Sequence, residues 1–244
     1  MLMRKQILYY ALKYQGDYQK IANALIHQEA WEDIHYEGQY ITIVDEEYPE
    51  KLKRLQYAPW ILFYKGNIDL LKHKAIAVIG GRQHSKYGVQ MCEKLVNSIK
   101  SRYVIVSGLA KGIDGYAHRS ALNTNTIAVL GCGIEVFYPY ENKQLQMEIA
   151  QNHLLLSEYP GMTKPYPSHF PWRNRILAAL SEGIVVIEAR VKSGTLKTVS
   201  YGLELDLPIY CIPHCFDNPW GKGGNVLIGQ GAYILAEEGD FDLI

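Results

Sequence analysis

The sequence predicts an α/β fold in which a doubly wound, mostly parallel sheet is covered by helices on both faces. Short, continuous apolar runs recur from Ala75 onward, as is typical of parallel strands that are buried on both sides. Between these runs lie stretches whose apolar residues follow helical spacing. Strands that alternate with helices in this way form a parallel sheet with right-handed crossovers.

The chain of 244 residues has room for one α/β domain of ordinary size and a small extra module. We expect three parts. Residues 1–40 form a small helical N-terminal segment, because Ile7 and Leu12 share one helical face. Residues 41–74 form a lead-in extension of two strands and a short helix, which covers an edge of the next part. Residues 75–244 form the main domain.

Within the main domain, strands and helices are expected to follow one another in order. The expected strands cover residues 75–80, 103–108, 126–131, 154–158, 184–189 and 208–213. The expected helices cover residues 87–100, 112–123, 141–150, 173–180 and 194–205, with a closing helix and a short strand after them. Ligands of doubly wound sheets bind beyond the carboxyl ends of the strands. We therefore expect the functional residues in the loops that follow each strand.

Composition limits the class of function. Lysine and arginine together equal aspartate and glutamate in number, at 25 each, so any nucleic-acid site must be a local patch. No apolar stretch is long enough for a membrane span, and the N-terminus has no secretory signal. We therefore expect a cytoplasmic protein with no membrane partner.

Signals for metals and cofactors are weak. The four cysteines are too scattered for a disulfide scaffold. Cys211, His214 and Cys215 lie close together, but no second pair with ligand spacing accompanies them, so we expect no metal. The sequence has neither a GxGxxG fingerprint nor a GxxxxGK[ST] P-loop, so we expect no cofactor.

The segment Ser157–Ile176, SEYPGMTKPYPSHFPWRNRI, is the most informative one and is called the proline-rich loop below. Its four prolines predict an extended loop, with Pro171 as the first residue of a helix. Cations alternate with aromatic rings, which is the chemistry that holds phosphates and stacks bases of single-stranded nucleic acid. A solvated loop whose arginines pair with carboxylates is the alternative. The candidate DNA-binding residues here are Lys164, His169, Phe170, Arg173, Asn174 and Arg175.

Three further loops contain residues suited to an anion. Gly80 and Gly81 let backbone N–H groups face a ligand, and Arg82 adds a guanidinium fork that suits phosphate. Asp114 is interpreted as a helix cap. The candidates in the loop after the second strand of the main domain are Ser107, Gly108 and Lys111, and those at a helix N-terminus after the fifth are Ser193, Gly194 and Thr195.

These motifs occur together in an order that resembles one family. They are GGR at Gly80–Arg82, SGLAKGID at Ser107–Asp114, GCG with YP at Gly131–Pro139, SEYP with HFPWRNRI at Ser157–Ile176, SGTLKT at Ser193–Thr198 and GGNVLIGQGA at Gly223–Ala232. The combination resembles the DNA-processing protein A (DprA/Smf) family, over about residues 40–240. The resemblance implies a Rossmann-like domain that binds single-stranded DNA and helps load the RecA recombinase in natural transformation. It also implies a homodimer formed through the α/β domain, and no catalysis.

Some positions depart from the family pattern. Gly81 stands where serine or threonine is usual, which preserves the role of Arg82. Ser168 precedes His169 where a basic residue is often found, so Lys164 is taken as its substitute. His214 replaces a common glycine. The winged-helix domain of many members does not follow Ile244, so duplex recognition by such a module is not expected.

Two other classes of function compete with this one. SGTL at Ser193–Leu196, close to Glu188, distantly resembles nucleotide-binding enzymes of the lysine-decarboxylase-like phosphoribohydrolase type. Those enzymes need a GGxGT run, and here Ser193 replaces its first glycine, while Glu204 lies too far along the helix to match. An adaptor that works through protein contacts is the third class. We expect DNA binding without enzymatic activity.

Overall fold

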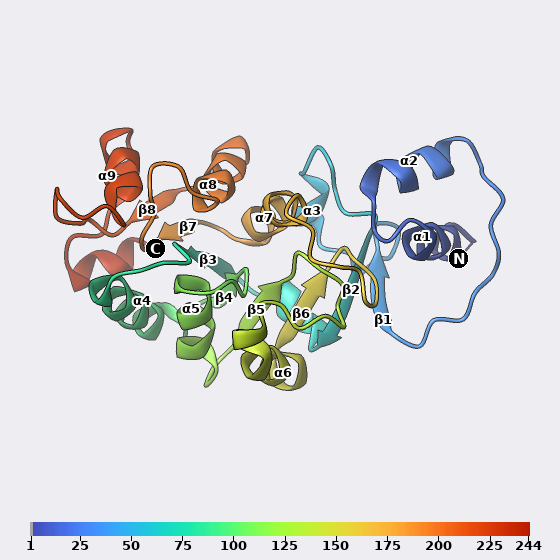
Figure 1. Cartoon of the computed structure of the whole chain (residues 1–244), viewed down its shortest axis with the longest axis horizontal. Coiled ribbons are helices and arrows are strands. Elements are labelled where there is room, and N and C mark those ends of the chain that lie inside the picture. Colours follow the sequence, from blue (N-terminus) through green and yellow to red (C-terminus); the bar gives the residue numbers. More distant parts are fainter. Residues whose placement is uncertain (1) are drawn as a thin grey trace.

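The computed structural model describes residues 2–244 and shows one nine-stranded sheet with helices on both faces (Figure 1). The strands are β1 (Gln39–Thr42), β2 (Ile61–Gly66), β3 (Ala75–Ile79), β4 (Val104–Ser107), β5 (Thr126–Val129), β6 (Leu154–Ser157), β7 (Ile184–Val186), β8 (Ile209–Cys211) and β9 (Tyr233–Ile234). Their order is β1-β2-β6-β5-β4-β3-β7-β8-β9. Strands β3 to β9 are parallel to one another, which confirms the predicted α/β fold.

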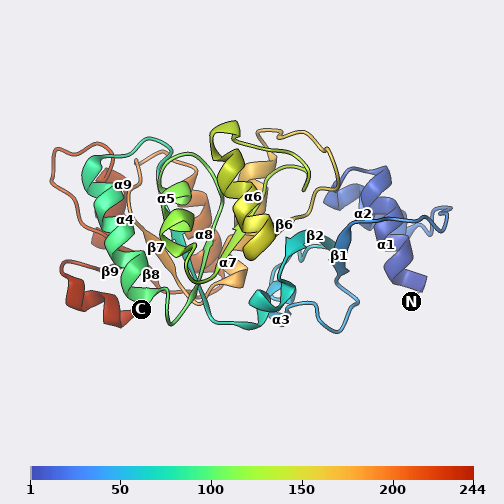
Figure 2. The same cartoon turned by 90° about the horizontal axis from the view of Figure 1, so that it is seen from below.

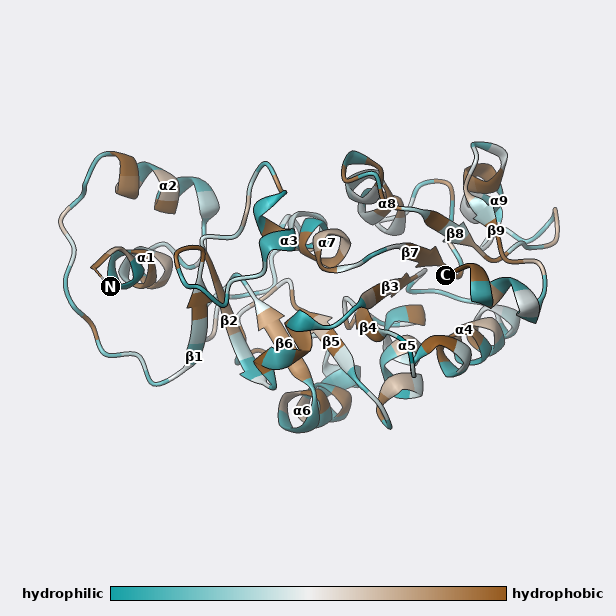
Figure 3. Ribbon diagram, turned by 180° about the vertical axis from the view of Figure 1, so that it is seen from behind, coloured by the Kyte–Doolittle hydropathy of each residue, from teal (hydrophilic) through white to brown (hydrophobic). Residues whose placement is uncertain are grey.

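Both faces of the sheet are covered, and this explains the unbroken apolar runs. The helices are α1 (Leu2–Lys13), α2 (Tyr18–Ile26), α3 (Glu50–Lys53), α4 (Lys86–Ile99), α5 (Ile113–Ala121), α6 (Lys143–Asn152), α7 (His169–Leu180), α8 (Thr195–Glu204) and α9 (Lys222–Gly229). Ile76 and Val78 pack with α4 and α5, whereas Ala77 and Ile79 pack with α7 and α8. Because successive side chains of a strand point to opposite faces, a strand between two helical layers needs apolar residues at every position. In Figure 1, α4, α5 and α6 lie below the sheet, and in Figure 2, which is seen from below, they lie in front of it. In Figure 3, β3 and β7 are brown, the colour of hydrophobic residues.

The strand order reverses beside β3. The chain proceeds from β3 through β4 and β5 to β6 on one side, and then returns to place β7 on the other side of β3. The loops after β3 and β7 therefore separate at the carboxyl edge of the sheet. A crevice at such a switch point is the general ligand site of doubly wound sheets.

The lead-in continues the same sheet rather than only covering its edge. β2 pairs antiparallel with β6, and β1 pairs antiparallel with β2. The N-terminal helices α1 and α2 pack beside β2 through residues that include Ile7 and Ile21, both buried. The Asp17 carboxylate caps α2 by accepting a hydrogen bond from the N–H of Lys20 at 3.1 Å. One sheet continues across residues 40 and 74. The division of the chain into three parts at these residues stays a prediction.

One helix start differs from the sequence prediction. α7 begins at His169, two residues before Pro171. Proline fits at its observed position because the first turn of a helix has no internal acceptors for its N–H groups. Among the described residues, no helix is both long and apolar enough to cross a bilayer.

Candidate nucleic-acid interface

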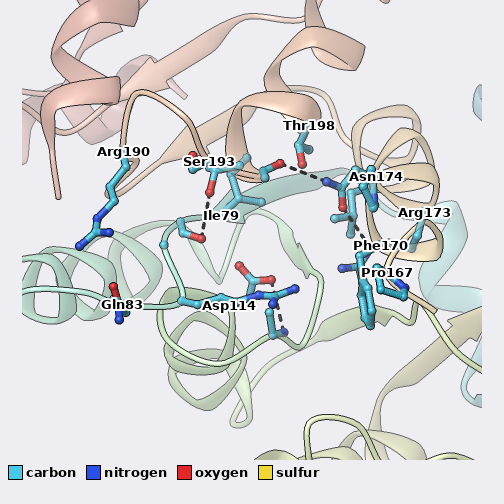
Figure 4. A pocket seen from close by; sticks show the side chains of 18 of the residues that line it. Ile79, Gln83, Asp114, Pro167, Phe170, Arg173, Asn174, Arg190, Ser193 and Thr198 are labelled. Carbon is cyan, nitrogen blue, oxygen red and sulfur yellow. Dashed lines mark hydrogen bonds between the residues drawn. The ribbon is translucent and has the colours of Figure 1, made fainter. Parts of the chain in front are cut away.

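A pocket of about 590 Å³ opens at the switch point beside β3 (Figure 4). Its walls are the loops after β3 and β7, the start of α5 and the proline-rich loop with the first turns of α7. In Figure 4, Arg190 and Gln83 lie on one side and Phe170, Pro167 and Arg173 on the other. The pocket lies where the topology of the sheet predicts a ligand site.

Arg82 and Phe170 form a cation beside an aromatic face in the pocket. The guanidinium carbon of Arg82 lies 5.6 Å from the ring centroid of Phe170. Gly131 makes room for this ring, because a Cβ atom at Gly131 would lie 2.7 Å from Phe170 Cδ1. Tyr138 packs on Phe170 at 5.3 Å between ring centroids and also lines the pocket. Arg82 is exposed and forms no salt bridge within residues 2–244, so its charge is available to an anion.

The floor of the pocket is polar and buried. Arg173 Nη1 donates a hydrogen bond to the carbonyl of Gly108 at 2.9 Å and a second one to the carbonyl of Val129. Burial lowers the pKa of Arg173 to about 10, so it remains cationic at pH 7. Burial raises the pKa of Asp114 above its ordinary value, although the nearby charge of Arg173 opposes this. The Asp114 carboxylate also accepts from the N–H of Ala110 at 3.4 Å, in the loop before α5. Contrary to the sequence prediction, it does not cap α5, because Gly112 is the N-cap residue and no side chain of the described residues makes a cap hydrogen bond there.

Hydrogen bonds join the loops that form the pocket walls. Thr195 Oγ1 donates to the carbonyl of Gly80 at 3.1 Å, and Asn174 Nδ2 donates to the carbonyl of Gly194 at 3.3 Å. The N–H of Gly81 donates to the carbonyl of Glu188 at 2.8 Å. The loops after β3 and β7 and helix α7 are therefore held in one fixed arrangement. The hydroxyl of Ser193 is buried and has no hydrogen-bond partner among the described residues.

The Glu188 carboxylate lies behind these loops rather than in the pocket. It accepts hydrogen bonds from Ser85 Oγ at 2.5 Å, from Ser85 N at 2.8 Å and from His214 Nε2 at 3.1 Å. Burial alone would raise its pKa, but the hydrogen bonds from His214 and Ser85 keep the pKa of Glu188 below its ordinary value. Glu188 follows β7, and Ser85 lies in the same loop as Arg82. Glu188 therefore holds this loop against the segment that follows β7.

The structure brings most of the predicted residues together. Those that line the pocket are Gly80, Gly81, Arg82, Phe170, Arg173, Asn174, Ser193, Gly194 and Thr195. Gly108 and Lys111 line a smaller cavity of about 50 Å³ next to Phe170 and Arg82. The Lys111 ammonium forms a surface ion pair with Glu141.

The remaining predicted residues lie elsewhere. Arg175 is 2% exposed and forms a two-point ion pair with Glu158, so its guanidinium does not reach the pocket. Ser107 is fully buried, and its hydroxyl donates to the carbonyl of Val78 at 2.7 Å. His169 stacks on Tyr159 on the opposite side of the proline-rich loop. Lys164 is exposed and does not line the pocket.

Arg190 and Trp220 are among the lining residues that sequence reasoning missed. The guanidinium of Arg190 lies 3.8 Å from the ring centroid of Trp220, and both side chains line the pocket. Arg190 follows β7, and its place in a loop at the carboxyl edge is the signal that could have identified it. Trp220 comes from the glycine-rich loop after β8, and no local pattern in the sequence connects it to Arg190.

The chain is similar to proteins of known family. Residues 39–242 match the family model described as DNA recombination-mediator protein A. DNA processing protein DprA of Streptococcus pneumoniae is 44% identical over 201 residues, which are 82% of this chain and 71% of that protein. The corresponding protein of Bacillus subtilis is 41% identical over 199 residues, covering 80% of this chain and 67% of that one. The chain covers 52% of Protein Smf of Escherichia coli, at 38% identity over 196 residues, or 79% of this chain.

Two solved structures are similar over most of the fold. The X-ray structure of DNA processing protein A from S. pneumoniae has a TM-score of 0.83 at 37% identity, and covers 98% of this chain and 92% of that one. DNA processing protein A from Helicobacter pylori, solved to describe its single-stranded DNA binding mode, has a TM-score of 0.77 at 31% identity. That match covers 84% of this chain and 94% of the other.

Proposed function

Because the chain belongs to the DNA recombination-mediator protein A family, we propose that it binds single-stranded DNA in the pocket beside β3. In this role it protects incoming DNA and helps load the RecA recombinase in natural transformation and recombination, in the cytoplasm. The proposal rests on Arg82, which forms no ion pair with residues 2–244 and lies 5.6 Å from the ring centroid of Phe170. A cation for a phosphate next to a π-face for a base is the basic unit of single-strand recognition.

The charge of the pocket supports this proposal. Its lining contains Arg82, Arg173 and Arg190 but, among the described residues, one acidic side chain, Asp114. The chain as a whole has a formal net charge of zero, so the excess of arginine over acid in this lining is a local feature. Such a local patch attracts the phosphate backbone without making the whole protein a polycation. Contrary to the sequence prediction, the glycines of the lining add no free N–H group at Gly81, because that N–H donates to the carbonyl of Glu188 at 2.8 Å.

The position of Glu188 agrees better with a binding site than with the active site of a phosphoribohydrolase. A phosphoribohydrolase of the competing type needs a carboxylate directed at the substrate. Here both carboxylate oxygens of Glu188 accept hydrogen bonds from Ser85 or His214, and the residue does not line the pocket. Glu204 lies on α8, away from the lining. We therefore propose no enzymatic activity for this site.

A homodimer is part of the proposal, because two pockets on one strand raise the effective concentration of the second site. The candidate surface is the C-terminal run Val226 to Leu235. Val226, Tyr233 and Ile234 are exposed, and β9 is the last strand at that end of the sheet. Unpaired edge strands and exposed apolar side chains favour association with a second chain.

One comparison tests the function directly. Affinity for oligo-dT of increasing length is measured beside affinity for a blunt duplex of the same length, at one salt concentration. We expect affinity to rise with oligonucleotide length and to exceed that for the duplex. Equal affinity for oligo-dT and for the duplex would contradict the proposal. In parallel, a panel of nucleoside monophosphates is assayed for release of free base, and any such release would instead favour the enzyme.

A further inference from the structure

A second groove, of about 470 Å³, lies on the side of the proline-rich loop that faces the N-terminal helices. We call it the tyrosine groove. It lies between the α1–α2 turn and the start of α7, and its aromatic lining is Tyr14, Tyr18, Tyr159, Tyr166, His169 and Trp172. Its volume falls in the range of ligand pockets. Because the groove needs residues 14–20, most of one wall precedes the segment that matches the family model.

The proline-rich loop is a ridge between the tyrosine groove and the pocket beside β3. Pro165 and Pro167 line the pocket, whereas Tyr166 and Ser168 line the groove. The alternation continues into α7, where Phe170 faces the pocket and His169 faces the groove. A single strand of DNA that leaves the pocket across this ridge therefore reaches the groove directly.

The lining of the groove suits a planar aromatic ligand. Tyr166 is 48% exposed, and its ring packs edge-on against His169 at 5.2 Å between centroids. Tyr18 and Trp172 pack at 5.8 Å and are both half-buried. The Nδ1 atom of His169 is buried without a hydrogen-bond partner among the described residues, so the groove wall contains an unused polar group. Aromatic faces with a few polar atoms are typical of base-stacking sites.

The charges in the groove oppose a phosphate site. Lys20 is the one lysine or arginine in its lining among the described residues, and its Nζ lies 3.5 Å from an Asp17 carboxylate oxygen. Asp17 itself lines the groove, so the net charge there is zero. A free phosphate would gain little, whereas an uncharged base loses nothing by this arrangement.

We propose that the tyrosine groove binds a nucleobase of the same single strand whose phosphates and neighbouring base occupy the pocket beside β3. This inference rests on the proposed function and extends it with a second stacking subsite. Contacts in the two sites differ in kind. The pocket contributes cations and one ring, and the groove contributes rings without net charge.

The test compares Tyr166→Ala with Tyr140→Ala, because Tyr140 is also exposed, at 73%, but lines neither the groove nor the pocket. Binding is measured to oligo-dT of about 4 and of about 20 nucleotides, lengths that fill one site or extend past it. We expect Tyr166→Ala to bind the longer strand about 5- to 150-fold more weakly, as for loss of one stacked base. The short strand should bind as to the wild type, and Tyr140→Ala should be unaffected. Tyr166→Phe should restore the affinity, since stacking needs the ring and not the hydroxyl.

Other outcomes overturn the inference. If Tyr166→Ala binds the longer strand as the wild type does, no base enters the groove, and the proposed function stands alone. A change in sedimentation coefficient with unchanged DNA affinity would identify the groove as a protein interface. Equal losses for both lengths would place Tyr166 within the first site rather than a second one. If the wild type binds neither strand, the proposed function fails, and the inference fails with it.

Discussion

Arg175 and Glu158 form a buried ion pair in which Nη1 and Nη2 of the arginine lie 2.6 and 2.5 Å from the two carboxylate oxygens. The guanidinium also packs on the Trp172 ring, 4.1 Å from its centroid, and its Nε donates to the carbonyl of Tyr57. This pair joins α7 to the end of β6 and to the lead-in. It thereby sets the rotation of α7, which directs Arg173 to the floor of the pocket.

The first prediction concerns this pair. Arg175→Ala should lower the free energy of unfolding by about 3–5 kcal/mol, because it leaves the Glu158 carboxylate buried without a partner. Urea denaturation followed by circular dichroism measures the change. Lys53→Ala, which removes an exposed ion pair with Glu50, is the matched control and should cost less than about 1 kcal/mol. A loss for Arg175→Ala as small as that of the control would show that the pair does not stabilise the fold.

The second prediction concerns phosphate binding. Arg82→Ala should weaken binding to all single strands alike and reduce the slope of log affinity against log salt by about 0.7, the share of one phosphate contact. Lys164→Ala should change the slope less, because Lys164 does not line the pocket. Fluorescence anisotropy at several salt concentrations gives both slopes. Lys94→Ala is the control, since Lys94 lies on α4, pairs with Glu238 and does not line the pocket. An unchanged slope in folded Arg82→Ala would remove the role assigned to Arg82.

The third prediction compares two changes at Phe170 by their effect on DNA affinity: removal of the ring and displacement of the ring. Phe170→Ala should cost about 1–3 kcal/mol of binding free energy and leave the salt slope unchanged, as loss of a stacked base does. Gly131→Ala should weaken binding by up to the same amount, because the new Cβ would lie 2.7 Å from Phe170 Cδ1 and displace the ring. Gly239→Ala, where a Cβ meets no atom within 4 Å, is the control. If Gly131→Ala binds DNA normally, the ring does not need its observed position.

Much of this arrangement follows from the sequence, but the direction of α7 does not. The apolar runs from Ala75 onward predicted the parallel strands because both faces of the sheet are buried. The prediction that Arg173 and Arg175 both face a ligand ignored helix geometry. At 3.6 residues per turn, side chains two positions apart point to nearly opposite sides. One of them could therefore face the pocket, and which one depends on where α7 begins and on the partner Glu158, a tertiary contact.

The residues that were missed show the same limit. Arg190 and Trp220 lie in loops after different strands, and only the pairing of β7 with β8 brings these loops together. The candidates Gly80, Arg82 and Ser193 could be identified because each lies in a loop between a strand and the helix that follows it. Local signals thus identify the loops of the site, whereas contacts between loops require the fold.

The last prediction concerns acid stability. His118 is fully buried, and its Nδ1 lies 2.7 Å from Thr126 Oγ1. Burial, assisted by the charge of Arg173, lowers the pKa of His118 from 6.5 to about 3. Between these two values the unfolded chain binds a proton at this site and the folded chain does not, so the free energy of unfolding must fall as pH falls. The slope from one such group is about 1.4 kcal/mol per pH unit. Burial also lowers the pKa of His153, which acts in the same direction, while the raised pKa of Asp114 opposes it.

Replacing His118 isolates its contribution to the pH dependence of the free energy of unfolding. His118→Gln removes the titrating group and keeps an amide that can reach Thr126, so stability should fall less steeply between pH 6.5 and 4 than in the wild type. Urea midpoints at several pH values measure the two slopes. His27→Gln, the same substitution at an exposed position, is the control for the change of residue type. The difference between slopes, rather than either slope alone, is decisive, because His153 and Asp114 contribute equally to both proteins. Parallel slopes for His118→Gln and the wild type would mean that His118 is protonated in the folded chain well above pH 3.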